Sequence, residues 1–303
     1  MKRRWLPIIA PALLGLAIGV WFNLSDLPNP TIFLRIDMSV LIFLMGMTLS
    51  VLAAVGMLVW DLIDRSRLNT ALQAAEERRR FLRRLDHELK NPLTAILAGL
   101  ANLAAVEDEK PQQAALSSVE AQVQRLSDLV ADLRKLSDLE TRPLERAPIN
   151  TSELLEEVFS LAQDRPGAAE RQLNLSIPQA PWPLPSVSGD RDLLFLAVHN
   201  LLDNAIKFTH PGDTIEMRAV EDGDQVVVEI ADTGPGIPET ETPHVWEELY
   251  RGEGARGVHG SGLGLSLVRA IVARHEGEVS LRSRAGQGTV ITMRLPVGDV
   301  SKQ

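Results

Sequence analysis

A lone histidine in FLRRLDHELKNPLTAI, residues 81–96, is a side chain that could do chemistry. His87 stands between Asp86 and Glu88, five residues before Pro92. A neutral imidazole offers a ring nitrogen as a nucleophile near pH 7, and a neighbouring carboxylate can hold or accept the proton on the other nitrogen. His87 with Glu88 is therefore a candidate nucleophile and proton acceptor that needs an electrophile.

The leucines around His87 indicate which way it faces. Leu82, Leu85 and Leu89 recur at helical spacing. At about 100° per residue, His87 points roughly 160° away from this apolar face, with Asn91 on the same outer side. An exposed helix histidine can also be inert, so these residues alone leave both readings open. A zinc helix is disfavoured because Asn91 stands where a second histidine is required.

Two asparagines and a lysine mark a second candidate site in GDRDLLFLAVHNLLDNAIKFTH, residues 189–210. The stretch has the spacing of an amphipathic helix, and Asn200, Asn204 and Lys207 lie along one polar line of it. Amide oxygens suit a magnesium ion that keeps several waters, and an ammonium suits a phosphate. Taken alone, these three residues also fit a solvated helix face.

Glycine-rich loops follow this helix in order. Two predicted strands, TIEMRAVE and QVVVEIAD, are separated by the hairpin signal DGD, and the second ends in DTGPGIP, residues 232–238. Asp232 there offers an acceptor to an exocyclic amine, and the glycines let backbone approach a ligand. The glycine cluster GEGARGVHGSGLGL then runs into a helix, which aims backbone N–H groups at phosphates, and GQGT precedes a last strand. The ordered set predicts a nucleotide pocket.

Two long helices are predicted upstream of this pocket. Residues 61–91 contain no proline or glycine and continue the leucine stripe of His87's helix. A second apolar stripe follows the polar break VEDEKPQQ, with a turn expected at residues 104–112. A hairpin of two such helices leaves both stripes partly uncovered, so we expect a homodimer that forms a four-helix bundle. The second stripe consists of Leu116, Val119, Val123, Leu126, Val130, Leu133 and Leu136.

Composition limits the class of protein. The chain has 303 residues, 45% of them apolar but only 4% aromatic, and a formal charge of −9. This charge disfavours a nucleic-acid partner. With no cysteine, disulfides and thiolate chemistry are excluded.

The N-terminal region predicts membrane spans. Residues 39–60 have no charge and about the length that crosses a hydrocarbon core of roughly 30 Å. Residues 5–22 carry tryptophans at both ends, which favours a first span over a cleaved signal peptide. The basic residues 2–4 predict a cytoplasmic start, so the segment after the second span is also cytoplasmic. The loop at 23–38 is too short to fold as a sensor domain.

From about residue 78 to 297, the chain resembles a sensor histidine kinase of bacterial two-component signalling. FLRRLDHELKNPLTAI looks like the family's phosphoacceptor box, NLLDNAIKF like its N box, and DTGPGIP, GSGLGLSLV and GQGT like its glycine boxes. The resemblance implies an ATP-dependent protein-histidine kinase that uses Mg²⁺. Such a protein is a homodimer in the cytoplasmic membrane, and it passes a phosphoryl group to an aspartate of a response regulator.

The resemblance also implies roles for individual residues. His87 would be the phosphoacceptor, Glu88 its acid–base partner, and Asn91 the amide that positions water for dephosphorylating the regulator. Asn200 and Asn204 would hold magnesium. The implied ATP-binding residues are Asn200, Asn204, Lys207, Asp232, Gly234, Gly236, Tyr250, Arg251, Gly260, Gly262, Gly264 and Thr289.

One departure from the family and two rival functions remain. The lid segment VWEELYRG places Trp246 and Leu249 where the family usually has phenylalanines, so we expect altered lid packing. An ATPase like those of gyrase, mismatch repair and a heat-shock chaperone would give no role to the His87 face. A catalytically silent scaffold or decoy would usually carry a broken pocket box, and the key polar positions are present.

The expected architecture is a membrane-anchored multidomain chain: two transmembrane helices, a helical hairpin that forms a dimeric four-helix bundle, and an α/β sandwich ATP-binding domain of the Bergerat type. The expected segments are a cytoplasmic start (1–4), transmembrane helix 1 (5–22), an outer loop (23–38), transmembrane helix 2 (39–60), a helical signalling linker (61–77), the dimerisation and phosphotransfer domain (78–140), a linker (141–148), the catalytic domain (149–297) and a tail (298–303).

Overall fold

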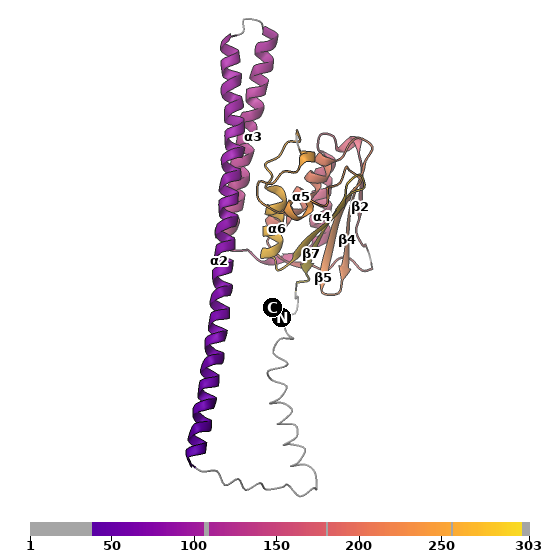
Figure 1. Ribbon diagram of the computed structural model, residues 1–303. Helices are drawn as coiled ribbons and strands as arrows, with labels where there is room; N and C mark the ends of the chain where they lie inside the picture. The colour runs from indigo at the N-terminus through magenta and orange to yellow at the C-terminus, as the bar shows by residue number, and fades with distance from the viewer. Residues whose placement is uncertain (1–37, 106–108, 180, 256, 299–303) are drawn as a thin grey trace. The chain divides into compact units, whose positions relative to one another are not determined.

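The computed structural model describes residues 38–105, 109–179, 181–255 and 257–298 (Figure 1). The chain divides into two compact units, Met1–Gln73 and Ala74–Gln303. The predicted first span, residues 5–22, lies outside the described residues.

The first unit contains the start of helix α2 (Met38–Ala105). Its segment Gly46–Leu68 is long and apolar enough to cross a membrane, with a mean hydropathy of 1.8. This segment overlaps the predicted span at 39–60. Where the sequence predicted two membrane helices, the described residues contain this one candidate.

The second unit begins with a helical hairpin. Helix α2 continues through Pro92 to Ala105, and α3 spans Glu109–Thr141, which confirms the predicted pair of helices. Helix α3 begins at Glu109, inside the stretch 104–112 where the turn was expected. Pro111 lies in the first turn of α3, where a helix does not need the N–H that proline lacks.

An α/β domain follows the hairpin. Its first strand, β1, begins inside the stretch predicted as a linker at 141–148, so the fold starts slightly earlier than the expected boundary at 149. Its helices and strands are β1 (Ala147–Ile149), α4 (Thr151–Gln163), β2 (Gln172–Ser176), β3 (Val187–Gly189), α5 (Arg191–Phe208), β4 (Thr214–Asp222), β5 (Gln225–Asp232), α6 (Gly264–Arg274), β6 (Glu278–Arg284) and β7 (Gly288–Pro296), with 3-10 turns at Ala168–Glu170, Thr242–His244 and Glu253–Ala255.

The main sheet has five strands in the order β2-β4-β5-β7-β6, and β1 pairs with β3 in a separate ribbon. Strand β2 runs parallel to β4, and the other neighbours in the main sheet are antiparallel. The predicted β4–β5 hairpin is confirmed, with Asp222 opposite Gln225. Gly223 at its tip has a φ of +66°, a conformation that glycine adopts without steric cost.

Helices α4, α5 and α6 cover one face of the sheet, so this domain has two layers (Figure 1). Alternate residues of the strands point into the layer between them, as period-two strands require. Ile215 and Met217 of β4 are fully buried there against Leu202 of α5 and Val268 of α6. This core fixes the polar face of α5, because the opposite face of the helix is occupied by apolar side chains.

A buried histidine joins the end of α6 to the start of α5. His275 is 1% exposed; its Nδ1 lies 2.8 Å from the carbonyl of Ile271, and its Nε2 accepts the N–H of Asp190 at 3.0 Å. Since the backbone N–H must donate to Nε2, the proton of the ring lies on Nδ1 and the ring is neutral. Gly189 has no room for a side chain, because an added Cβ would lie 2.3 Å from the ring of His275.

Candidate active site

The His87 face lies on α2 in the hairpin. His87 and Asn91 are exposed, one helical turn apart, which confirms the predicted orientation. Glu88 is partly buried, and its Oε2 accepts a bond of 2.9 Å from Arg125 of α3. The carboxylate beside His87 is therefore held by a fixed cation.

Pro92 is buried and lies inside the unbroken helix α2. In an α-helix the N–H of residue 92 would donate to the carbonyl of Glu88. Proline has no N–H, so this carbonyl lacks its usual donor. Helix α2 continues past Pro92 to Ala105.

Helix α5 positions the amides and the lysine. Asp190 caps its start by accepting the N–H of Leu193 at 3.2 Å. Asn200, Asn204 and Lys207 line a cleft on the polar side of the helix. The amide nitrogen of Asn200 donates to the carbonyl of Leu196 at 2.8 Å, which leaves its Oδ1 as a free acceptor.

Asp232 closes one end of the cleft at the last residue of β5. Its Oδ1 accepts the N–H of Gly234 at 2.9 Å, and Thr289 of β7 is its neighbour in the sheet. Burial raises the pKa of the Asp232 carboxyl, while backbone donors from Gly234 and Thr289 oppose the rise. A partly buried carboxyl with a free oxygen suits an exocyclic amine.

The lid segment covers another side of the cleft. The guanidinium of Arg251 donates to the carbonyls of Gly260 at 3.0 Å, Ala255 at 2.7 Å and Val258 at 2.5 Å. Burial lowers the pKa of Arg251, and the nearby charge of Arg125 lowers it further. The guanidinium donors of Arg251 therefore bind carbonyls of the lid and stabilise its conformation.

Lid and hairpin contact each other within the second unit. Arg84 of α2 donates to Glu247 and to the carbonyl of Glu248, and its guanidinium lies 5.7 Å from the ring centre of Tyr250. Ser261 donates to Asp132 of α3 at 2.7 Å.

Leu249 shows how the unusual lid residues pack. It is 4% exposed, despite a φ of +59° that is rare for a side chain of its size, and it packs with Leu129 of α3 and Leu263. Trp246 packs against the main core of the α/β domain. The two unusual lid residues therefore pack in different places: Leu249 against the hairpin and Trp246 against the core of the α/β domain.

The structure brings most of the predicted ATP-binding residues to one cleft of about 630 Å³. Gly234 does not line the cleft, but its backbone N–H donates to the carboxylate of Asp232, which does. His87, Glu88 and Asn91 do not line it either. The predicted residues that line it are Asn200, Asn204, Lys207, Asp232, Gly236, Tyr250, Arg251, Gly260, Gly262, Gly264 and Thr289.

The cleft also contains residues that the sequence did not reveal. Arg165, His199 and Asp203 line it, as does Lys135 of α3. The spacing of Asp203 four residues before Lys207 could have indicated an ion pair along the helix. Arg165 lies 38 positions from Asp203, so no local pattern could have predicted that it would reach this carboxylate.

Magnesium fits the chemistry of the α5 face. Two amide side chains and phosphate oxygens, with water, form an oxygen-rich environment of the kind Mg²⁺ takes. Within residues 38–298, apart from the gaps stated above, no group of three or more His, Asp or Glu side chains could hold a metal. Asn200 and Asn204, which line the cleft, are the residues whose amide oxygens would hold this ion.

Comparisons with known proteins agree with both halves of this arrangement. Residues 77–142 match the His Kinase A (phospho-acceptor) domain, and residues 189–299 match the family of histidine kinase-, DNA gyrase B- and HSP90-like ATPases. A hairpin with an exposed histidine, followed by an ATPase-like domain, defines a two-domain kinase architecture. The chain belongs to the sensor histidine kinases of two-component signalling.

Two curated relatives show the extent of the similarity. Sensor histidine kinase YclK of Bacillus subtilis is 32% identical over 228 residues, which cover 73% of this chain and 47% of YclK. Signal transduction histidine-protein kinase BaeS of Escherichia coli is 32% identical over 241 residues, which cover 77% of this chain and 50% of BaeS. The chain thus spans about half the length of these relatives.

Solved structures share the fold. Full-length ShkA in complex with AMPPNP aligns with a TM-score of 0.51 at 27% identity, over 70% of this chain and 44% of ShkA. Histidine kinase ThkA in complex with response regulator protein TrrA aligns with a TM-score of 0.60 at 22% identity, over 74% of this chain and 63% of that chain. The second likeness is one of fold alone.

Proposed function

We propose that this protein is a membrane-anchored sensor histidine kinase that phosphorylates His87 with ATP and passes the phosphoryl group to an aspartate of a response regulator. The observation that carries the proposal is the convergence of eleven predicted ATP-binding residues on one cleft, in a chain that also presents His87 beside Glu88. The relatives named as sensor kinases support it.

The chemistry follows from the two sites. A ring nitrogen of His87 forms a bond to the γ-phosphorus of ATP as the bond to the β,γ-bridging oxygen breaks, and ADP leaves with that electron pair. Glu88 holds the proton on the other ring nitrogen. Lys207 and the lid N–H groups position and neutralise the phosphates, which is most of what phosphoryl transfer needs. A magnesium ion on Asn200 and Asn204 would supply further charge neutralisation.

Transfer requires the two sites to meet. The cleft is lined on the hairpin side by Asp128, Asp132 and Lys135 of α3, not by His87. In this proposal, the ATPase domain moves along the hairpin or reaches His87 of a second copy. The phosphoryl group then passes to a receiver aspartate of a response regulator, the partner that the resemblance to sensor histidine kinases implies.

Dimerisation is part of the proposal. The hairpin exposes large apolar side chains that a second hairpin would cover in a four-helix bundle. They lie along one side of each helix, at Leu82, Leu93, Leu97 and Leu100 of α2 and at Leu116, Val123 and Val130 of α3.

The segment assignments are proposed as well. The segment Gly46–Leu68 supports one membrane crossing, and residues 5–22 are the proposed crossing that precedes it in the chain. The hairpin and the ATPase domain are proposed to lie in the cytoplasm of a bacterial cell. The phosphotransfer domain is placed at 78–140 and the catalytic domain at 149–297.

Both rivals to this function lack support in the cleft. A silent scaffold or decoy has no need for a cleft in which the amides, the lysine and Asp232 are all in place. An ATPase without kinase activity gives no role to the exposed His87 beside Glu88. A kinase uses both features.

The proposal is tested by incubating the full chain with γ-labelled ATP and magnesium. We expect a phosphate that is labile in acid and stable in base on the wild type, the behaviour of a nitrogen–phosphorus bond, and none on His87→Gln. Equal labelling of the two proteins, or no labelling of either, would reject the proposal.

A further inference from the structure

Asp203 of α5 is paired with two cations at once. Its Oδ2 lies 2.7 Å from the ammonium of Lys207, and its Oδ1 accepts from the guanidinium of Arg165. Asp203 is only 15% exposed, so its charge is poorly hydrated and needs a partner. Arg165 comes from the loop after α4 and lines the cleft with Asp203 and Lys207.

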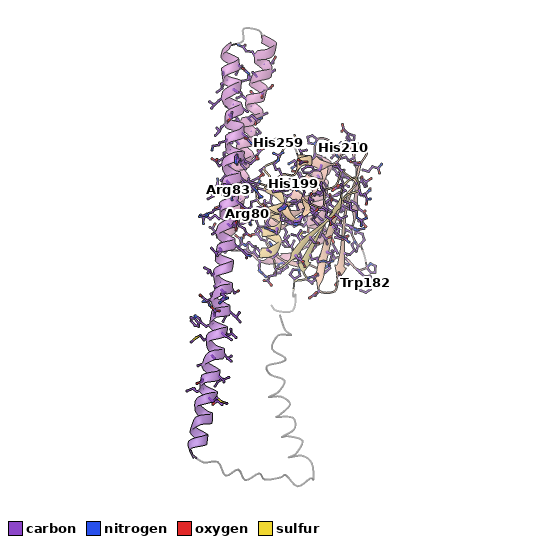
Figure 2. The ribbon with its side chains drawn as sticks, viewed as in Figure 1. Arg80, Arg83, Trp182, His199, His210 and His259 are labelled. Atoms are coloured by element: carbon purple, nitrogen blue, oxygen red, sulfur yellow. The ribbon has the colours of Figure 1, made fainter. Side chains whose placement is uncertain are left out.

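His199 fixes the position of the arginine. The second guanidinium nitrogen of Arg165 lies 3.0 Å from Nε2 of His199, a half-buried side chain of the α/β domain (Figure 2). A guanidinium can only donate, so Nε2 accepts and the imidazole is neutral. Burial, and then the charge of Arg165, lower the pKa of His199, in agreement with a neutral ring.

The pairing sets a condition on phosphate binding. To contact a phosphate, Lys207 must either leave Asp203 or share its ammonium group between Asp203 and the phosphate. A carboxylate left buried without a cation is strongly unfavourable, whereas one that keeps a cation is not. Arg165 is a second cation on Asp203, and its fork can hold both Asp203 and His199 when Lys207 moves.

We propose that Arg165 is a positioning residue for the nucleotide: it keeps the charge of Asp203 paired, so that Lys207 can exchange from Asp203 to the phosphates of ATP. The inference rests on the proposed ATP site of this cleft. Arg165 acts through Asp203 and Lys207 and need not touch the nucleotide.

The test uses the full chain in lipid nanodiscs, with displacement of trinitrophenyl-ATP by ATP and by adenosine. Arg165→Met leaves Lys207 as the cation on Asp203, so we expect ATP affinity to fall by roughly tenfold, the scale of one charge-assisted hydrogen bond. Adenosine affinity should not change, because adenosine has no phosphates. In the labelling assay, KM for ATP should rise and kcat should stay near that of wild type.

Rescue separates this role from a merely structural one. Asp203→Asn removes the charge that holds Lys207, so Arg165→Met combined with Asp203→Asn should regain most of the lost ATP affinity. Arg165→Lys keeps a cation on Asp203 and should bind ATP nearly as wild type does; it also serves if Arg165→Met does not fold. Arg282→Met is the matched control, since Arg282 is 78% exposed and does not line the cleft.

Three results would overturn the inference: unchanged ATP affinity in Arg165→Met, an equal loss for adenosine, or no recovery in the double variant. If the wild type binds ATP, any of these results counts against the role of Arg165 and not against the proposed ATP site. A wild type that fails to displace trinitrophenyl-ATP with ATP would overturn the proposed function together with this inference.

Discussion

His87 and Asn91 share an exposed face of α2 but carry separable tasks. His87 is the proposed phosphoacceptor, and Asn91, one turn later, is the proposed amide that orients water during dephosphorylation of the regulator. In this assignment, attack on ATP does not use the Asn91 amide, whereas hydrolysis of the regulator's phosphoaspartate does.

Asn91→Ala should therefore keep autophosphorylation within about twofold and slow dephosphorylation of the regulator by tenfold or more, the scale of a lost water-positioning group. Both rates can be followed with labelled phosphate on the two proteins. If both activities fell, or neither did, Asn91 would not have the assigned role.

His275 predicts a dependence of stability on pH. Burial lowers the pKa of His275 below its ordinary value, against the opposing effects of its bond to Ile271 and of Asp190, while Arg146 and Arg274 lower it further. Below about pH 6.5 the unfolded chain takes up a proton on this histidine and the folded chain does not. The free energy of unfolding should therefore fall as pH drops below about 6.5, by up to about 1.4 kcal/mol per pH unit, until the pKa of the folded state is reached.

Chemical denaturation between pH 5 and 8 measures this slope. His275→Gln should lower stability at pH 8 and flatten the slope. His199, whose pKa is also lowered, contributes part of the wild-type slope that remains in this variant. His210→Gln is the control, because His210 is 76% exposed at the rim of the domain (Figure 2), and an equal flattening in this control would contradict the assignment.

Among the elements around the cleft, the glycine loop before β7 fixes the end of the cleft at Asp232. Gly288 at the start of β7 has a φ of +101°, and a Cβ there would lie 1.9 Å from the carbonyl oxygen of Asp232. A side chain at this position must strain the backbone and push β5 away from β7.

Gly288→Ala should lower the free energy of unfolding of the domain by about 1–3 kcal/mol and weaken adenosine binding. Gly286→Ala is the matched control, since Gly286 also has a positive φ, +77°, but open space around its Cβ. It isolates the backbone cost, about 1 kcal/mol, from the clash. Equal losses in the two variants, by thermal denaturation and adenosine displacement, would show that the close approach is unimportant.

Periodic elements were predictable from the sequence. The α5 helix, the β4–β5 hairpin and the two long helices carry their own signals in the spacing of apolar residues. The positive φ of Leu249 was not predictable, because tertiary packing and not local preference decides it.

The candidate site divides in the same way. The α5 amides could be placed because they sit on one periodic helix. Arg251 could be placed near the cleft, but its bonds to three lid carbonyls depend on how the lid folds. Arg165 meets Asp203 only through the packing of α4 beside α5, which no local pattern encodes.

At the level of the whole molecule, the hairpin exposes an apolar side that the proposed four-helix bundle would cover. Leu93 is 49% exposed and Val123 is 52% exposed in one chain. Fully burying such a side chain contributes about 1.5–3 kcal/mol, so covering its exposed half contributes about half of that, and the proposed bundle covers each of them twice.

Leu93→Glu combined with Val123→Glu should therefore convert a dimer to a monomer, as measured by light scattering on the full chain with the detergent contribution subtracted. Leu161→Glu is the control, because Leu161 is 47% exposed on α4 of the ATPase domain. A dimer that survives both hairpin substitutions, or a wild type that is monomeric, would contradict the four-helix bundle.

The proposed function requires the cleft on α5 to supply the phosphoryl group that His87 receives. The most direct measurement is to expose the full chain to ATP and magnesium and locate the phosphate by mass spectrometry at neutral to basic pH, comparing wild type with a folded Asn204→Ala variant. We expect phosphate on His87 of the wild type and little or none on the variant. Phosphate on another residue, or on His87 to the same extent without Asn204, would contradict it.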